Sequence, residues 1–146
     1  MSYSLKSIRL EGIRGINKAT DIKFNEGLTI IHGSNGTGKS SILQAIEWGF
    51  TGAIPYMRGG DFTKEDAIVN AFTKSGQARV ELRFSGPQDI RLSRTKKRTK
   101  STTSGRHQFN LEADRSYEND DAEAYLENMF NLSLDDMPRS KFLHQE

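Results

Sequence analysis

The sequence has no cysteine, few prolines and no long apolar run. Its 146 residues include no Cys, 3 Pro and 1 Trp, and 34% are hydrophobic. Without cysteine there is neither a disulfide framework nor a thiolate metal site. No apolar stretch approaches the roughly 20 residues that a membrane span needs, and the first residues lack the apolar segment of a signal peptide. We therefore expect no membrane partner and a cytoplasmic or nucleoid-associated location (nuclear in a eukaryote).

Charge is nearly balanced but unevenly distributed along the chain. The formal net charge is +2. Every charged residue in 91–107 is basic, whereas Arg115 is the one base among the acids of 112–127. Such an asymmetry indicates either a polyanion-binding face or two solvated surfaces. His32, His107 and His144 show no metal-ligand spacing, so we assign them no chemistry.

Residues 33–40 match the phosphate-binding P-loop pattern G-x-x-x-x-G-K-[ST] at every fixed position. The apolar run 28–31 before it predicts a short buried strand, and the spacing of Ile42, Ile46 and Phe50 after it predicts a helix over 41–50. In such a loop, glycines let backbone N–H groups approach an anion at the helix N-terminus. Lys39 would then reach the β- and γ-phosphates, and Ser40 would bind Mg²⁺. The predicted nucleotide-binding residues are Gly33, Ser34, Asn35, Gly36, Thr37, Gly38, Lys39, Ser40 and Ser41.

The rest of the chain alternates between strand-like and helix-like segments. Alternating apolar residues predict strands over 7–12, 21–24 and 78–84, and a return strand from Ile90 makes a hairpin. Phe109 and Leu111 suggest one more strand, and helical spacing predicts a helix over 122–130. A capping box at Thr63 predicts a further helix. Residues 96–106 lack core-forming side chains and are predicted to form an exposed loop.

The predicted nucleotide site lacks one usual component. P-loop sites normally have a second acid at the end of another buried strand, which holds Mg²⁺ or polarises water. No run of four apolar residues followed by Asp or Glu occurs in this sequence. The P-loop therefore looks like half of a composite site.

Residues 8–52 resemble the N-terminal lobe of SMC/SbcC-type ABC ATPases, the coiled-coil proteins of DNA repair and chromosome structure. The loop and helix at 33–48 carry most of this resemblance. It implies an α/β P-loop NTPase fold with a mixed sheet and an antiparallel β portion. It also implies that 1–146 is one lobe, which ends at a glutamine loop before a coiled coil. The metal-binding acid, signature motif and catalytic Glu would belong to a C-terminal lobe.

The resemblance also implies roles for residues outside the loop. Gln145 would bind Mg²⁺ and position the attacking water, although Glu146 stands where the family usually has Gly. Asn35 and Arg14 would contact the phosphate region, and Arg58 resembles an arginine that links DNA binding to ATP turnover. The alternatives are an ordinary terminal Gln, a solvated turn Arg and a loop cation. For the cluster Lys96, Lys97, Arg98 and Lys100 we expect either salt-sensitive contact with the DNA backbone or plain solvation.

Three hypotheses follow. In the first, the chain is half of an ATPase head whose partners are its own C-terminal lobe, a second head, DNA and a nuclease or accessory subunit, with ATP and Mg²⁺ as cofactors. This half alone should then be inactive. In the second, it is a self-contained P-loop phosphotransferase. In the third, it is a non-catalytic DNA-binding or dimerisation module with a degenerate nucleotide site, which includes SMC-like phage-defence proteins.

Overall fold

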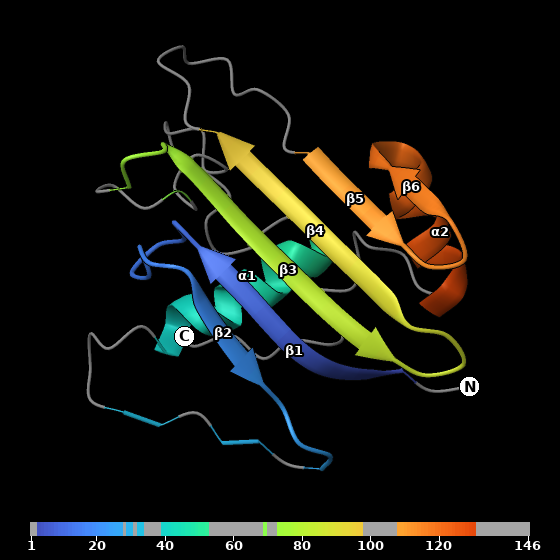
Figure 1. The fold of residues 1–146 in the computed structure, drawn as a ribbon, viewed down its shortest axis with the longest axis horizontal. Helices are drawn as coiled ribbons and strands as arrows, with labels where there is room; N and C mark the ends of the chain where they lie inside the picture. Colours follow the sequence, from blue (N-terminus) through green and yellow to red (C-terminus); the bar gives the residue numbers. More distant parts are fainter. Residues whose placement is uncertain are drawn as a thin grey trace.

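In the part of the chain that the structure describes, a computed structural model, six strands form one antiparallel sheet and two helices lie on one side of it (Figure 1). The structure describes residues 3–27, 29–30, 32–33, 39–52, 69, 73–97 and 108–130. The elements are β1 (Ser4–Glu11), β2 (Thr20–Lys23), α1 (Lys39–Thr51), β3 (Gln77–Ser85), β4 (Ile90–Lys97), β5 (Gln108–Glu112), β6 (Ser116–Glu118) and α2 (Asn119–Phe130). The strand order is β2-β1-β3-β4-β5-β6.

Strand register aligns the apolar residues into a row that crosses the sheet. The row consists of Ile22, Ile8, Leu82, Leu92, Leu111 and Tyr117, one from each strand. Successive side chains of a strand point to opposite faces, so the alternating pattern of each strand places this row on a single face. Ile8, Leu82, Leu92 and Leu111 are each no more than 1% exposed, and burying such a side chain stabilises the fold by about 1.5–3 kcal/mol.

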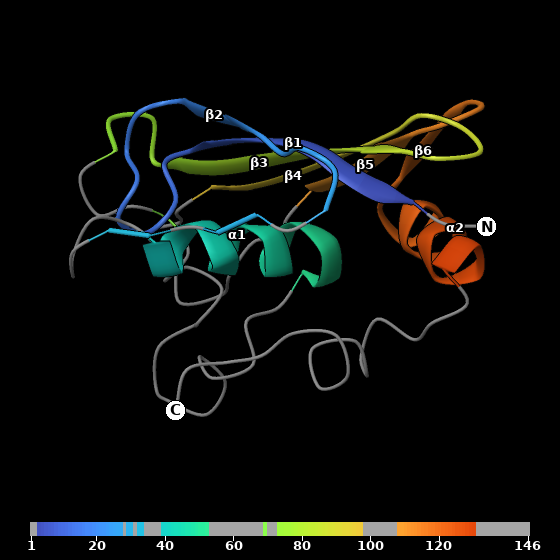
Figure 2. The same ribbon diagram turned by 90° about the horizontal axis from the view of Figure 1, so that it is seen from below.

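Both helices cover this apolar face, as Figure 2 shows. Helix α1 contacts β3 and β4, and α2 contacts β5 and β6. Ala45 and Trp48 of α1 and Ala122 and Leu126 of α2 are buried in the same core. Neither α1 nor α2 lies over the opposite face in Figure 2, and we call this the open face. An antiparallel sheet tolerates this because its second face carries the polar residues of the alternating pattern.

Most of the predicted elements are present. The predicted helices over 41–50 and 122–130 correspond to α1 and α2, and the predicted strands correspond to β1, β2, β3, β4 and β5. The α/β class and the antiparallel portion are confirmed. Strand β6, which has three residues, was not predicted.

The prediction of a buried strand over 28–31 is wrong for the residues that the structure describes there. Thr29 and Ile30 lie outside every strand, and Ile30 is 72% exposed. An apolar run becomes a strand only when a neighbouring strand takes up its backbone hydrogen bonds, and no strand of the described sheet pairs with these residues. Every strand pairing in the described part of the chain is antiparallel, so the parallel part of the predicted mixed sheet is not found there.

The prediction that the exposed loop begins at residue 96 is also wrong. Lys96 and Lys97 belong to β4, because the ladder with β3 continues through the pairs Ala78–Lys96 and Gln77–Lys97. Lys96 points to the covered face and is 1% exposed. Its ammonium is therefore not on the surface of this chain, which removes it from the expected DNA-contacting cluster.

Other predictions fall outside the described residues. These are the loop over 53–62, the remainder of the basic loop and the segment after α2. Of the helix predicted from Thr63 to Phe72, only Val69 is described, and it forms an isolated β-bridge with Ile13 and no helical turn. In the described part of the chain, no helix has both the length and the apolar character that crossing a membrane requires.

Candidate nucleotide-binding site

A tight turn after β1 carries Arg14 at its tip. Ile13 and Ile16 exchange two backbone hydrogen bonds, with N···O distances of 2.9 and 2.7 Å, so Arg14 and Gly15 form the two central positions. Arg14 has a φ of 46°, a left-handed conformation that costs a non-glycine residue roughly 1–2 kcal/mol. Strain of this kind persists where surrounding contacts fix the backbone, and it concentrates at functional sites.

Two glycines hold this turn in place. Gly12 has a φ of +65°, and a Cβ there would lie 2.2 Å from the Gln77 carbonyl oxygen at the start of β3. The backbone N–H of Gly15 donates to Oγ of Ser41 at 3.1 Å, across 26 positions of the sequence. Ser41 lies in the first turn of α1 and is 8% exposed. The hydrogen bond from Gly15, the residue after Arg14, thus fixes the turn against the beginning of α1.

Lys39 is the first residue of α1, and its ammonium turns back toward the loop. Nζ donates a hydrogen bond to the carbonyl oxygen of Gly33, the first residue of the P-loop pattern. The first turn of α1 contains no acid of its own, so the helix itself supplies no carboxylate to neutralise the positive end of its dipole. A helix N-terminus with a mobile ammonium above it fits the phosphates of a nucleotide.

Two hydrogen bonds thus connect predicted nucleotide-binding residues: Lys39 contacts Gly33, and Ser41 contacts the main chain of Gly15, next to Arg14. The positions of Ser34, Asn35, Gly36, Thr37 and Gly38 lie outside the described residues, as do those of Arg58, Arg98, Lys100 and Gln145. For Ser40 the structure describes only the helical backbone. Lys97 is exposed at the end of β4. Their proposed roles remain predictions.

Helix α1 also buries polar residues that the sequence did not single out. Gln44 is 9% exposed and Glu47 is 3% exposed. Oε1 of Gln44 has no hydrogen-bond partner among the described residues. The spacing of Ser40, Gln44 and Glu47 is the helical i, i+4, i+7 pattern, which places them along one side of α1. This periodicity is the sequence signal that could have identified these three residues as one polar side of the helix.

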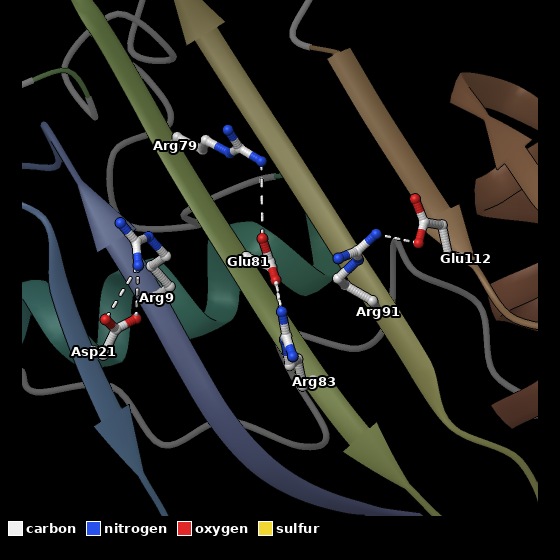
Figure 3. A network of polar contacts seen from close by, with 7 residues as sticks. All are labelled: Arg9, Asp21, Arg79, Glu81, Arg83, Arg91 and Glu112. Carbon is white, nitrogen blue, oxygen red and sulfur yellow. Dashed lines mark hydrogen bonds and ion pairs between the residues drawn. The ribbon is translucent and has the colours of Figure 1, made fainter.

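The open face of the sheet carries a network of ion pairs, drawn in Figure 3. Glu81 lies between Arg83 at 3.0 Å and Arg79 at 3.8 Å, and Arg9 contacts Asp21 at 3.2 Å. Arg91 pairs with Glu112 on the neighbouring strand. The arginines are 42–59% exposed at their side chains, whereas Glu81 is 11% exposed. The Arg9–Asp21 and Arg91–Glu112 pairs are therefore solvated, and each contributes at most about 1 kcal/mol.

Two further observations bear on the chemistry. Within the described ranges, no group of three or more His, Cys, Asp or Glu side chains could hold a metal ion, so any Mg²⁺ site would depend on Ser40, on phosphate oxygens and on residues outside those ranges. The hydrogen bond from Arg115 to the Tyr117 hydroxyl raises the pKa of this guanidinium. Arginine is charged at all physiological pH values in any case, so this shift has no consequence for the site.

Comparison with known proteins places this geometry in context. A family model described as an AAA domain matches residues 7–146. The DNA repair protein RAD50 of Drosophila melanogaster is 28% identical over 103 residues, which cover 66% of this chain and 8% of the relative. The chromosome partition protein Smc of Mycolicibacterium paratuberculosis is 37% identical over 73 residues, or 49% of this chain and 6% of the relative. The chain thus spans less than a tenth of the length of these curated relatives.

Solved structures agree at the level of the fold. A structure described as "Structural biochemistry of ATP-driven dimerization and DNA stimulated activation of SMC ATPases" aligns with a TM-score of 0.70 and 20% identity. The alignment covers 97% of this chain and 86% of the other. At this identity the likeness shows a shared fold and nothing finer.

Proposed function

The chain belongs to the AAA domain family and is an N-terminal ATPase lobe of the SMC/SbcC type, and from this we propose that it supplies the phosphate-binding half of a composite ATP site. In this proposal Lys39 and the backbone of 33–40 hold the β- and γ-phosphates, and Ser40 and Gln145 bind Mg²⁺. Arg14 contacts the phosphates from the turn after β1. Bound Mg²⁺ would stabilise the charge that develops on the transferred phosphoryl group.

One observation carries this proposal. The strained turn at Arg14 is fixed to the first turn of α1 by the Gly15–Ser41 hydrogen bond, and Lys39 begins the same turn. The turn that carries Arg14 therefore contacts the helical turn that carries Lys39, and that helical turn contains no acid. Such an arrangement favours an anionic ligand, because the helix dipole and the Lys39 ammonium both attract negative charge to the helix N-terminus. In our proposal the Arg14 guanidinium adds to them.

The second half of the site would come from a C-terminal lobe of the same polypeptide. Ile30 and Leu43 are large hydrophobic residues exposed by 72% and 57%, and they flank the P-loop on either side in the sequence. We propose that this lobe covers both side chains. The relatives are more than ten times as long as the matched segment, which supports a missing lobe as the cover.

The cellular role that we propose is ATP-driven pairing of two such heads, which controls access to DNA. The relatives are named for DNA repair and for chromosome partition, and a structural neighbour is described by ATP-driven dimerisation and DNA-stimulated activation. Lys97, Arg98 and Lys100 would contact the DNA backbone without sequence preference. A nuclease or accessory subunit completes the proposed assembly, in a cytoplasmic, nucleoid or nuclear location.

ATP turnover by the complete polypeptide tests the proposal. Lys39→Ala should lower the turnover rate at least about 100-fold, because it removes a charge that stabilises the transition state. Lys23→Ala is the matched control, since Lys23 is an exposed lysine of β2, away from α1. Equal turnover by both variants would contradict the proposal.

Expression of residues 1–146 alone tests the composite nature of the site. We expect weak ATP binding and negligible hydrolysis, both restored when the remainder of the polypeptide is added. Vigorous hydrolysis by 1–146 alone would instead favour a self-contained phosphotransferase. Full function of the complete polypeptide with Lys39→Ala would favour a non-catalytic module.

A further inference from the structure

Arg94 is a fully buried cation on the helix-covered face of the sheet. It lies on β4, opposite Val80 of β3 and Phe109 of β5, and its side chain is 0% exposed. The residues on either side of it in the same row of the sheet are apolar. Burying a charged guanidinium is costly unless other groups replace the water that it loses. The contacts of Arg94 with neighbouring elements therefore indicate its role.

The first group is the end of the P-loop helix. Nε of Arg94 donates to the carbonyl oxygen of Gly49 at 3.2 Å. Gly49 is in the last turn of α1, where carbonyls have no amide ahead of them within the helix. The last turn of α1 has no basic residue of its own, so Arg94 supplies the positive charge that the negative end of the helix dipole favours.

The packing around Gly49 makes this contact possible. A Cβ at Gly49 would lie 2.9 Å from Cγ1 of Val80 and 3.2 Å from Cδ1 of Leu82. The absence of a side chain lets the end of α1 approach β3 closely and brings its carbonyl to Arg94. Arg94 and Gly49 thus fix the C-terminal end of α1, about 20 Å from the P-loop end for a helix of this length.

The second group is the beginning of α2. Nη1 of Arg94 lies 3.8 Å from Oε1 of Glu123, and its guanidinium lies 3.9 Å from the centroid of the Phe109 ring. The backbone N–H of Phe109 in turn donates to Oδ1 of Asn119, the first residue of α2, at 3.1 Å. Arg94 is therefore linked to α2 directly through an ion pair and indirectly through the residue on which it stacks.

We propose that Arg94 is a positioning residue that couples α2 to the P-loop helix, so that the placement of α2 sets the rate of turnover at the N-terminal end of α1. This rests on the proposed ATPase function. A shift of α2 would pull on Arg94 and tilt α1 through Gly49. A displacement of about 1 Å at reacting groups costs as much as 100-fold in rate, so a small tilt of α1 is sufficient to alter turnover at Lys39.

Glu123→Gln in the complete polypeptide is the main test, because it weakens the ion pair and leaves Arg94 in place. We expect the maximal rate of ATP turnover to fall about 3- to 10-fold with the KM for ATP within about 2-fold, as for coupling residues remote from a ligand. Glu112→Gln is the matched control. It also removes the carboxylate partner of a β4 arginine, Arg91, but on the open face, and it should leave both constants unchanged.

Arg94→Lys adds a second variant that keeps the charge. Lysine cannot stack on Phe109 and bond Gly49 with the planar geometry of arginine, so we expect the same loss of rate as for Glu123→Gln. The double variant should show no further loss, because two residues of one network are not additive. A fall in the unfolding midpoint without any change in turnover would overturn the proposal, as would additive losses.

Amide exchange at Gly52 separates this proposal from the proposed function. Its N–H bonds the Trp48 carbonyl at 2.7 Å and closes the last turn of α1. Glu123→Gln should accelerate exchange at this amide severalfold, whereas Glu112→Gln should not. This readout does not require ATP. If wild-type protein shows no turnover that depends on Lys39, the proposed function fails, whereas unchanged exchange overturns the coupling itself.

Discussion

Arg91 and Arg94 lie three residues apart on β4 and point to opposite faces of the sheet. Arg91 pairs with Glu112 on the open face and remains 42% exposed at its side chain. Arg94 lies on the covered face at 0% exposure, where a helix carbonyl, an aromatic ring and a carboxylate surround it. The same residue type is thus a solvated surface charge in one place and an internal link between elements in the other.

The difference between the two faces is one of dielectric environment and of geometry. On the open face, water already solvates the arginines, so a pair gains little and salt weakens it. On the covered face, every contact of the cation replaces lost hydration, so removal of a contact has a large cost. Substitutions on the covered face should therefore have larger effects than matched substitutions on the open face.

Arg94→Ala should have the largest effect. It leaves a cavity beside Phe109 and removes the donor to the Gly49 carbonyl, so we expect the free energy of unfolding to fall by about 3 kcal/mol. Denaturant unfolding of wild type and variant measures this loss. A loss no larger than that of Arg91→Ala would mean that the two faces are equivalent.

Gly49→Ala should have the next largest effect. The added methyl group meets Val80 and Leu82 at short distances, and overpacking costs about 1–3 kcal/mol. Alanine gains about 1 kcal/mol in helix propensity, which leaves a net loss of about 1 kcal/mol. Leu43→Ala, at an exposed position of the same helix, serves as the control in thermal unfolding. A more stable Gly49→Ala variant would show that α1 does not need to approach β3 so closely.

Glu81→Gln should have a small effect that depends on salt. It removes the acceptor that Arg79 and Arg83 share on the open face. We expect a loss of up to about 1 kcal/mol at low ionic strength that largely disappears near 1 M salt, where the screening length is about 3 Å. Unfolding measured at both salt concentrations tests this, and a loss that salt does not reduce would point to burial of Glu81 as its cause.

Arg91→Ala should have the smallest effect. The side chain is solvated and its pair with Glu112 lies at the surface, so we expect a loss within about 0.5 kcal/mol. Chemical unfolding at low salt, next to Arg94→Ala, gives the direct comparison. A loss above 1 kcal/mol would show that the open face contributes to stability as the covered face does.

The sequence predicted the elements better than it predicted their surroundings. Helix α1 and strand β3 follow from periodicity that lies entirely within each segment, and both are present. The pattern at the end of β4 was misleading. Lys96 begins a segment whose composition is typical of a solvated loop. Its backbone nevertheless continues the ladder with β3, and its side chain is buried. Composition cannot show this, because the residues that enclose β4 come from other segments of the chain.

The apolar run 28–31 misled the prediction in the opposite way, because it indicated burial where the structure shows exposure. It has the composition of a buried strand, but Ile30 is exposed and no strand of the described sheet pairs with it. Hydrophobicity expresses a preference for burial, and only a neighbouring strand can satisfy the backbone groups. Under the proposed function, that neighbour belongs to a lobe that these residues do not include.

The sequence by itself determined the P-loop pattern, the helix that follows it and the alternation of the strands, since each depends on residues close together in the chain. The tertiary structure decided that the turn at Arg14 is fixed to the first turn of α1, through a hydrogen bond between residues 26 positions apart. It also decided that Arg94 fixes the other end of the same helix, 45 positions away from Gly49. Such contacts depend on which faces the elements bury, and that choice is made by the packing of the whole sheet against its helices.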